Sequence, residues 1–194
     1  MPATKTPRPL VISTGVGEAR DRRRDAASFS RLVRGDRDAL ADLYDAHARS
    51  LFRHGLALTR RASDAEDLVQ SVFLKLATTG ARLLAVRNPA NYLHRMLRAA
   101  WIDEQRRPSA AHEAPAEAGA DPPAQDHTTV AEAVMDVTRA FTRLPAPQRE
   151  IVVLHLIEGF SFREAGRITN VPMFTAASRY RAALERLRQM MGRR

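Results

Sequence analysis

Hydrophobic positions recur every three to four residues in two stretches of the chain, residues 28–107 and 129–194. This spacing puts apolar side chains on one face of a helix, whereas the strict alternation of a half-buried strand extends nowhere for long. The pattern predicts an all-α fold with two small helical domains joined by a flexible linker. Helices are expected after Asp36, after Ser63, from Asn88 to about Arg107, and at about 129–142, 147–158, 161–168 and 172–190.

Several residue pairs predict where these helices begin and which face each one buries. Asp36 can cap the first helix, Ser63 and Glu66 have the spacing of a capping box, and Asn88-Pro89 is a cap followed by Pro at the first helical position. Ser161 and Glu164 repeat the capping-box spacing. The expected buried positions are Leu40, Leu43, Tyr44, His47, Leu51 and Leu58 in the first helix, Val69, Val72, Phe73 and Leu76 in the second, and Ile151, Val152, Leu154 and Leu156 in the C-terminal domain.

Two segments lack this periodicity. Residues 1–27 contain three prolines, two glycines and an arginine cluster, and we predict a disordered basic tail there. Residues 108–128 contain four prolines and seven alanines but no large apolar side chain, so they predict an acidic, extended linker. The domain division is therefore 1–27, 28–107, 108–128 and 129–194.

The charge distribution follows this division. The chain of 194 residues has 31 Lys and Arg against 22 Asp and Glu, a net charge of +9. Residues 28–107 and 129–194 each carry +5 and the tail +3, while the linker carries −4. Two basic modules on a tether suggest a polyanion contacted at two places. A net positive charge that only maintains solubility, or an arginine bias from a GC-rich genome, would give the same totals.

Composition excludes several classes of protein. The chain has no Cys, which rules out disulfide scaffolds, thiolate metal sites and a Cys nucleophile. No apolar run approaches the ~20 residues that span a bilayer, and Leu10–Ile12 is too short for a signal peptide, so we expect a cytoplasmic protein. The six histidines are scattered and no phosphate loop or nucleophile motif occurs. We therefore expect no enzyme activity, no catalytic residues, no metal and no cofactor.

The segment 64–76, DAEDLVQSVFLKL, predicts an exposed acidic helix face in a basic protein. Its buried stripe leaves Glu66, Asp67, Gln70 and Leu74 on the other faces. Carboxylates in a first turn also suit the helix dipole, so a well-capped surface helix explains them equally well. The alternative is a surface that a protein partner binds.

The segment 91–107, NYLHRMLRAAWIDEQRR, interleaves arginines with aromatic residues. Arginines can hold a phosphate backbone, and aromatic rings can stack on unpaired bases. Tyr92 and Trp101 could instead belong to the core of a helical bundle.

Residues 144–188 have the pattern of a helix-turn-helix: two helices joined by a tight turn at Asn170, the second polar and basic on its outer side. Such a helix can enter a major groove, although an ordinary helical hairpin has the same pattern.

Together these segments resemble bacterial RNA polymerase sigma factors of the extracytoplasmic-function (ECF) type. The similarity covers residues 29–107 and 130–191 and rests on DAEDLVQSVFLKL, NPANYLHRMLRAAWIDEQRR and the 144–188 motif, in that order. The resemblance implies a sigma region-two-like domain and a sigma region-four-like domain. It also implies the partners core RNA polymerase, promoter DNA and an anti-sigma factor, and no membrane insertion.

The resemblance implies three sets of binding residues. Core polymerase would be bound by Glu66, Asp67, Gln70 and Leu74; the −10 element by Tyr92, Arg95, Arg98, Trp101 and Arg106; and the −35 element by Arg163, Thr175, Ser178, Arg179 and Arg181. The chain departs from the family pattern at Ala99, at Phe174 and at Ala165-Gly166. The function implied is a sigma factor that directs promoter-specific transcription initiation. The alternatives are a helix-turn-helix regulator that binds DNA without polymerase, and a sigma-like adaptor that sequesters an anti-sigma protein.

Overall fold

A computed structural model describes residues 15–106 and 129–192, with side chains described from residues 23 and 135 onward in the two ranges. The predicted linker, residues 108–128, lies outside them. All regular elements described are helical, which confirms the fold class. In chain order they are α1 (Gly15–Val33), α2 (Asp38–Thr59), α3 (Ala62–Thr79), the 3₁₀ helix η1 (Gly80–Ala85), α4 (Pro89–Arg106), α5 (Thr129–Thr142), α6 (Ala146–Val152), the π-helical turn η2 (Val153–Ile157), α7 (Phe162–Thr169) and α8 (Met173–Met191).

The first helix corrects one prediction. The predicted disordered tail covers residues 1–27, but residues 15–27 belong to α1. Helical periodicity is weak there because a buried position of the segment is the polar residue Asp25. Asp25 is 6% exposed and its Oδ2 lies 2.9 Å from His47 Nε2 of α2, which ties the helix to its neighbour. Residues 1–14 lie outside the described part of the chain.

The N-terminal half, residues 15–106, is built around one apolar core. Leu51, Leu93 and Leu97 are fully buried at its centre, and the predicted stripe of α3 lies against them. The structure thus confirms Val69, Val72, Phe73 and Leu76 as core positions. Tyr44, which the periodicity assigned to the buried face of α2, is 48% exposed instead.

Local signals set most helix starts in this half. Asn88 Oδ1 accepts a hydrogen bond from the Asn91 amide at 3.0 Å, which confirms the cap of α4, and Asp36 Oδ1 accepts from the Asp38 amide at 3.0 Å. The predicted capping box of Ser63 and Glu66 is wrong. Because Arg61 is the extended residue before α3, the helix already includes Ser63, whose hydroxyl bonds to Asp64 Oδ1.

The C-terminal half, residues 129–192, contains the predicted helix-turn-helix. Ser161 and Glu164 form both hydrogen bonds of a capping box at the start of α7, as predicted. Asn170 adopts the left-handed conformation with φ of 54° at the turn into α8, also as predicted. A Cβ added to Gly166 would lie 2.7 Å from the Val171 carbonyl oxygen, so the departure at this position lets the turn close tightly.

The π-helical turn η2 corrects one core position. Ile151, Val152 and Leu154 are buried as predicted, but Leu156 is 58% exposed. The amide of Glu158 bonds to the carbonyl of Val153, five residues back, and this wider turn rotates the following side chains. An α-helical period assumed through the segment therefore assigns Leu156 to the wrong face.

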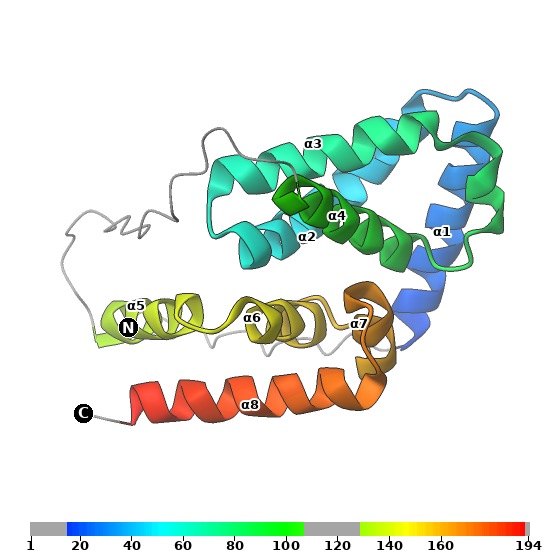
Figure 1. The fold of residues 1–194 in the computed structure, drawn as a ribbon. Helices are drawn as coiled ribbons and strands as arrows, with labels where there is room; N and C mark the ends of the chain where they lie inside the picture. The colour runs from blue at the N-terminus through cyan, green and yellow to red at the C-terminus, as the bar shows by residue number, and fades with distance from the viewer. Residues whose placement is uncertain (1–14, 107–128, 193–194) are drawn as a thin grey trace, which may run out of the picture.

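The two halves pack directly on each other as two layers (Figure 1). α6, η2 and α7 lie against α2 and α4, whereas α8 packs on α5, α6 and α7 on the far side of the C-terminal half. The start of α4 and one side of α7 therefore meet at the interface, and α8 is turned away from it.

Candidate polymerase-binding and nucleic-acid-binding surfaces

The outer face of α3 is exposed, as the sequence predicts. Glu66, Asp67 and Gln70 lie at the surface, and Leu74 is 72% exposed although it is apolar. The buried residues of the same helix fix this orientation, because they occupy the opposite face. The face therefore combines two carboxylates, an amide and an apolar side chain.

An open cleft runs between α2 and α3 beside this face. It is lined by Tyr44, Arg49 and Phe52 from α2 and by Glu66, Val69 and Gln70 from α3. The Tyr44 ring lies on Phe73, with 4.9 Å between ring centroids. The α2 side of this cleft is not among the predicted surfaces, because helical periodicity assigns Tyr44 to the core. The spacing of positions 44, 48 and 52 on one helix face was the available signal.

The candidate −10 residues all lie on α4, but in different environments. Arg95 and Arg106 are exposed, whereas Tyr92 and Trp101 are half-buried and pack against the N-terminal core. Tyr92 makes an edge contact with Phe29 at 6.2 Å. The alternative in which these two rings contribute to the bundle core is therefore confirmed in part, and each ring keeps some exposed surface.

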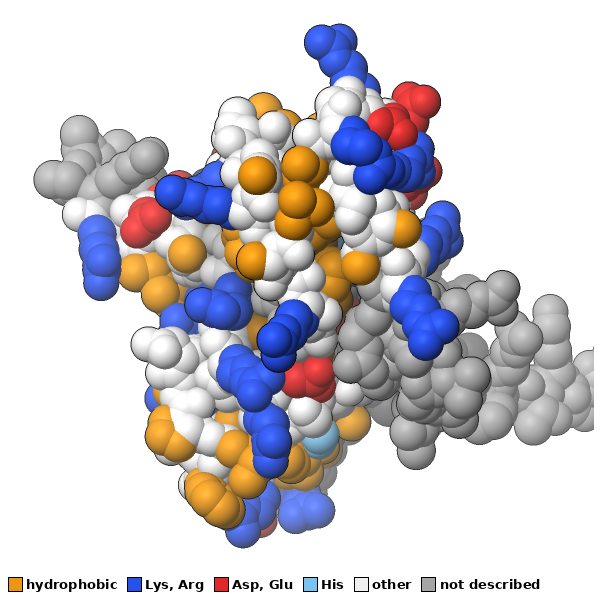
Figure 2. Space-filling model, turned by 90° about the vertical axis from the view of Figure 1, so that its right-hand side faces the viewer, with side chains coloured by type: hydrophobic (Ala, Val, Ile, Leu, Met, Phe, Trp, Pro, Cys, Tyr) orange, Lys and Arg blue, Asp and Glu red, His pale blue; other side chains and the backbone are white. Residues whose placement is uncertain are grey.

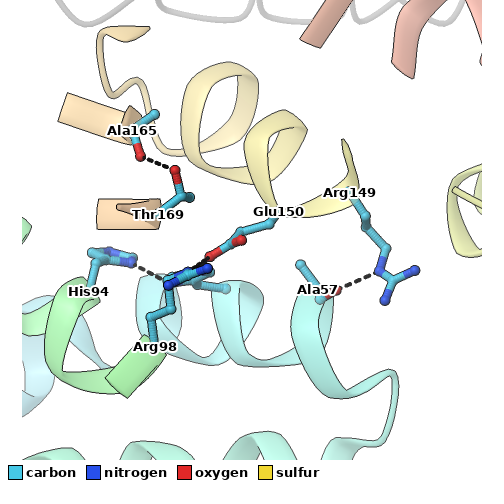
Figure 3. A network of polar contacts seen from close by, with 8 residues as sticks. Ala57, His94, Arg98, Arg149, Glu150, Ala165 and Thr169 are labelled. Carbon is cyan, nitrogen blue, oxygen red and sulfur yellow. Dashed lines mark hydrogen bonds and ion pairs between the residues drawn. The ribbon is translucent and has the colours of Figure 1, made fainter. Parts of the chain in front are cut away.

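Arg98 is the candidate −10 residue that meets the other half of the molecule. Its Nε donates to Glu150 Oε1 of α6 at 3.0 Å, and its side chain is 19% exposed (Figure 3). His54 Nε2 reaches the same oxygen at 3.2 Å, and Glu150 itself is 2% exposed. A buried carboxylate thus joins α2, α4 and α6.

Two buried histidines, His54 and His94, extend this contact into a chain of hydrogen bonds in which each donor can be assigned. Ser50 donates its single proton to Glu158 Oε2 at 2.5 Å, so His94 Nε2 must donate to Ser50 Oγ at 3.0 Å. The other nitrogen of His94 then accepts from His54 Nδ1, 3.0 Å away. His54 is thereby placed to donate through both ring nitrogens, to His94 and to Glu150.

His94 is neutral in this pair. Its side chain is fully buried, and burial together with the nearby charge of His54 holds the pKa of His94 well below its usual range. In the sequence these histidines are only scattered, because the two residues that meet here are 40 positions apart.

Two further carboxylates of the C-terminal half contact the N-terminal half. Glu158 accepts from Arg53 Nε at 2.5 Å, and this hydrogen bond raises the pKa of Arg53. Glu164, the capping residue of α7, accepts from the side-chain amides of Asn88 and Asn91, each at 3.3 Å. No local pattern in the sequence predicts these contacts, since the acidic residues stand there only as part of a basic block.

In one further contact across the interface, the C-terminal half contributes a cation instead of a carboxylate. Arg149 of α6 is 4% exposed and donates from Nε to the Ala57 carbonyl in the last turn of α2 at 2.5 Å (Figure 3). It also donates to the Leu144 carbonyl at 2.8 Å. Burial lowers the pKa of Arg149, and the negative end of the α2 dipole compensates its charge.

The candidate −35 residues lie on the helix-turn-helix. Arg163 on α7 and Ser178 and Arg181 on α8 are exposed, while Thr175 and Arg179 are half-buried. Arg163 and Arg167 line an open cleft with Asn170 and Pro172 at the turn. Figure 2 shows Lys and Arg side chains spread over both halves on one side of the molecule, with few acidic side chains among them. Such a surface can bind the backbone of a nucleic acid.

The described residues contain neither a candidate metal site nor a membrane-spanning helix. In residues 15–106 and 129–192, no three His, Asp or Glu side chains are arranged so that they could hold a metal ion. Within the same ranges, every helix is too short or too polar to cross a membrane.

Each half of the chain matches a known protein-family model. Residues 43–110 match the model of Sigma-70 region 2, and residues 135–187 match that of Sigma-70, region 4. The first match contains the α2–α3 cleft and α4, and the second contains the helix-turn-helix.

Individual proteins agree over nearly the whole chain. The ECF RNA polymerase sigma factor SigM of Mycobacterium tuberculosis is 32% identical over 187 residues, which cover 96% of this chain and 94% of that protein. The ECF RNA polymerase sigma factor SigW of Bacillus subtilis is 25% identical, with 84% of this chain and 94% of SigW covered.

Solved structures show the same fold. CnrH, in complex with the cytosolic domain of CnrY, aligns with a TM-score of 0.61 at 18% identity over 87% of this chain and 97% of that chain. The sigma factor RpoE, in complex with the anti-sigma factor NepR from Bartonella quintana, aligns with a TM-score of 0.55 at 24% identity over 78% and 98%. With both sigma regions in the expected order and a relative matched along its length, the chain belongs to the ECF RNA polymerase sigma factors, which direct promoter-specific transcription initiation.

Proposed function

We propose that the chain works through three separate surfaces. The exposed face of α3, with Glu66, Asp67, Gln70 and Leu74, binds core RNA polymerase. The basic and aromatic side of α4, with Tyr92, Arg95, Arg98, Trp101 and Arg106, binds the −10 element. The helix-turn-helix, with Arg163, Thr175, Ser178, Arg179 and Arg181, binds the −35 element. In this arrangement residues 28–107 and 129–194 act as two modules joined by the linker 108–128.

The observation that carries the proposal is the separation of charge between these surfaces. The carboxylates of α3 are exposed beside a cleft lined by both apolar and polar side chains, which suits a protein partner. The exposed arginines of α4, α7 and α8 lie on other elements, where a phosphate backbone would be favoured. The polymerase supplies the chemistry, and this chain selects the start site without catalytic residues of its own. We place this activity in the cytoplasm.

An anti-sigma factor is the third partner that we propose. RpoE and CnrH were both solved with a bound protein, and RpoE's is called an anti-sigma factor. Binding to such a protein without transcription would identify the sigma-like adaptor instead. Binding to DNA without polymerase would identify an independent helix-turn-helix regulator.

Adding the purified chain to sigma-free core polymerase tests the proposal. The proposed function predicts initiation from selected promoters that depends on this chain. Asp67→Arg should abolish assembly with the polymerase, because it places a cation where a carboxylate is proposed to meet a basic partner. Glu185→Arg, an equal charge reversal on the exposed face of α8, is the control and should assemble normally. If Asp67→Arg assembles with the polymerase as well as the wild type does, the proposal that α3 binds core polymerase is wrong.

A further inference from the structure

Phe174, in the first turn of α8, is an unusual surface residue. Its side chain is 77% exposed, more than that of any other large hydrophobic residue in the described ranges. The other aromatic side chains of the helix-turn-helix have partners: Phe162 stacks on His155 with 3.9 Å between centroids, and Tyr180 meets the same ring edge-on. Phe174 contributes nothing comparable to the core, so folding does not explain it.

The buried face of α8 fixes where Phe174 points. Ala176 and Ala183 are fully buried against α6 and α7, which orients the helix. At 100° per residue, Phe174, Ser178 and Arg181 form one stripe directly opposite that buried face. Phe174 therefore begins the same outward stripe that contains two of the candidate −35 residues.

The side chains around this stripe favour DNA as its binding partner. Arg163 and Arg167 line the cleft at the start of α8, and no contact within the described residues pairs either guanidinium with a carboxylate. Basic groups beside the start of a recognition helix hold the backbone while its first residues reach base edges in the major groove. The apolar feature that the major groove presents is the C5-methyl group of thymine.

We propose that Phe174 packs against the methyl group of a thymine in the −35 element and makes this chain selective for thymine at that position. The inference rests on the proposed function, since it assumes that α8 is the recognition helix. The chain departs from the family pattern at Phe174, and relatives without an aromatic ring at this position could not make the contact. Phe174 would therefore give this chain a base preference that such relatives lack.

Replacing thymine by uracil tests the contact, because uracil keeps the base pair and lacks only the methyl group. Holoenzyme made with the full chain is titrated with duplexes in which each −35 thymine, on either strand, is replaced in turn. With the wild type, one replacement should weaken binding roughly fourfold, the effect of losing one buried methyl-sized group. With Phe174→Ala, binding to the thymine duplex should be weaker, and the same replacement should have no further effect.

Met191→Ala is the matched control. It removes another exposed apolar side chain at the opposite end of α8 and should keep the full sensitivity to uracil. Because Phe174 is exposed, Phe174→Ala should keep the helical content and melting temperature of the wild type, which circular dichroism checks.

Three results would overturn the inference. One is equal sensitivity of wild type and Phe174→Ala to every uracil replacement, and another is the absence of any methyl-sensitive position. The third is impaired assembly of Phe174→Ala with polymerase in the absence of DNA, which would make Phe174 a protein-binding residue. A wild-type holoenzyme that binds no promoter would instead show that the proposed function is wrong, and the inference would fall with it.

Discussion

Glu150 joins the two halves of the molecule, and changing it tests what holds them together. Its Oε1 lies 3.0 Å from Arg98 Nε and 3.2 Å from His54 Nε2, and the residue is 2% exposed. Glu150→Gln keeps the shape of the side chain and removes its charge. We expect the two halves to separate more readily while each half stays folded.

The size of the effect follows from the two contacts. A hydrogen bond to a charged group contributes ~1.5–3 kcal/mol and a neutral one ~0.5–1.5 kcal/mol, so each bond loses about 1 kcal/mol. The Arg98 side chain is 19% exposed, and water screens part of its contribution. A total of about 2 kcal/mol lowers the ratio of packed to separated halves roughly 30-fold.

Energy transfer between two dyes can measure this ratio directly. The chain has no cysteine, so residues introduced at Ala77 of α3 and Gln189 of α8, both exposed, can be labelled selectively. In a urea titration, transfer in Glu150→Gln should be lost at a lower urea concentration than in the wild type. Circular dichroism, recorded in parallel, should keep its helical signal through that loss.

Glu185→Gln serves as the control, because Glu185 is exposed and its ion pair with Arg188 stays within α8. Equal urea midpoints for Glu150→Gln and Glu185→Gln would refute the reasoning that the buried carboxylate holds the halves together. Simultaneous loss of energy transfer and helical signal in Glu150→Gln would show that the halves do not unfold separately.

Two more predictions concern single side chains. Because the pKa of His94 is lowered by burial, the unfolded chain binds a proton that the folded chain does not; the free energy of unfolding should therefore fall as the pH drops through ~6.5. Urea unfolding between pH 8 and 5.5 measures this, and a His94→Gln variant with the same pH dependence as the wild type would contradict it. Arg179→Ala should weaken holoenzyme binding by ~1–3 kcal/mol and relax the preference at one −35 position, as a promoter library would reveal. A uniform loss over all sequences would assign Arg179 to a phosphate.

Local signals in the sequence predicted most of the fold. The capping residues Asn88, Ser161 and Asn170 mark their helix ends because each acts through backbone groups four residues away or fewer. The exposed face of α3 follows equally from the period of its core residues. The capping box predicted at Ser63 is wrong because α3 begins earlier. The extended residue before the helix is Arg61, two positions upstream of Ser63.

The remaining wrong predictions have two causes. Either the backbone departs from α-helical geometry, or a side chain contacts a residue far away in the sequence. Leu156 is exposed because a π-helical turn breaks the period on which the prediction relied. Arg98 was assigned to DNA alone because its partner, Glu150, is 52 residues away across the linker. No periodic pattern encodes such a contact, since it depends on how the two halves of the molecule meet.

If Arg98 binds the −10 element as proposed, its contact with Glu150 makes the C-terminal half an internal competitor for promoter DNA. Where Arg98 binds the −10 backbone, its guanidinium must first leave the carboxylate, so only the fraction of molecules with separated halves is competent. A ratio of about 100 packed molecules to one separated would weaken the apparent affinity by about the same factor. A tethered competitor also keeps a constant local concentration however much protein the cell makes. Overproduction alone therefore does not relieve the competition; a partner that binds only the separated form does.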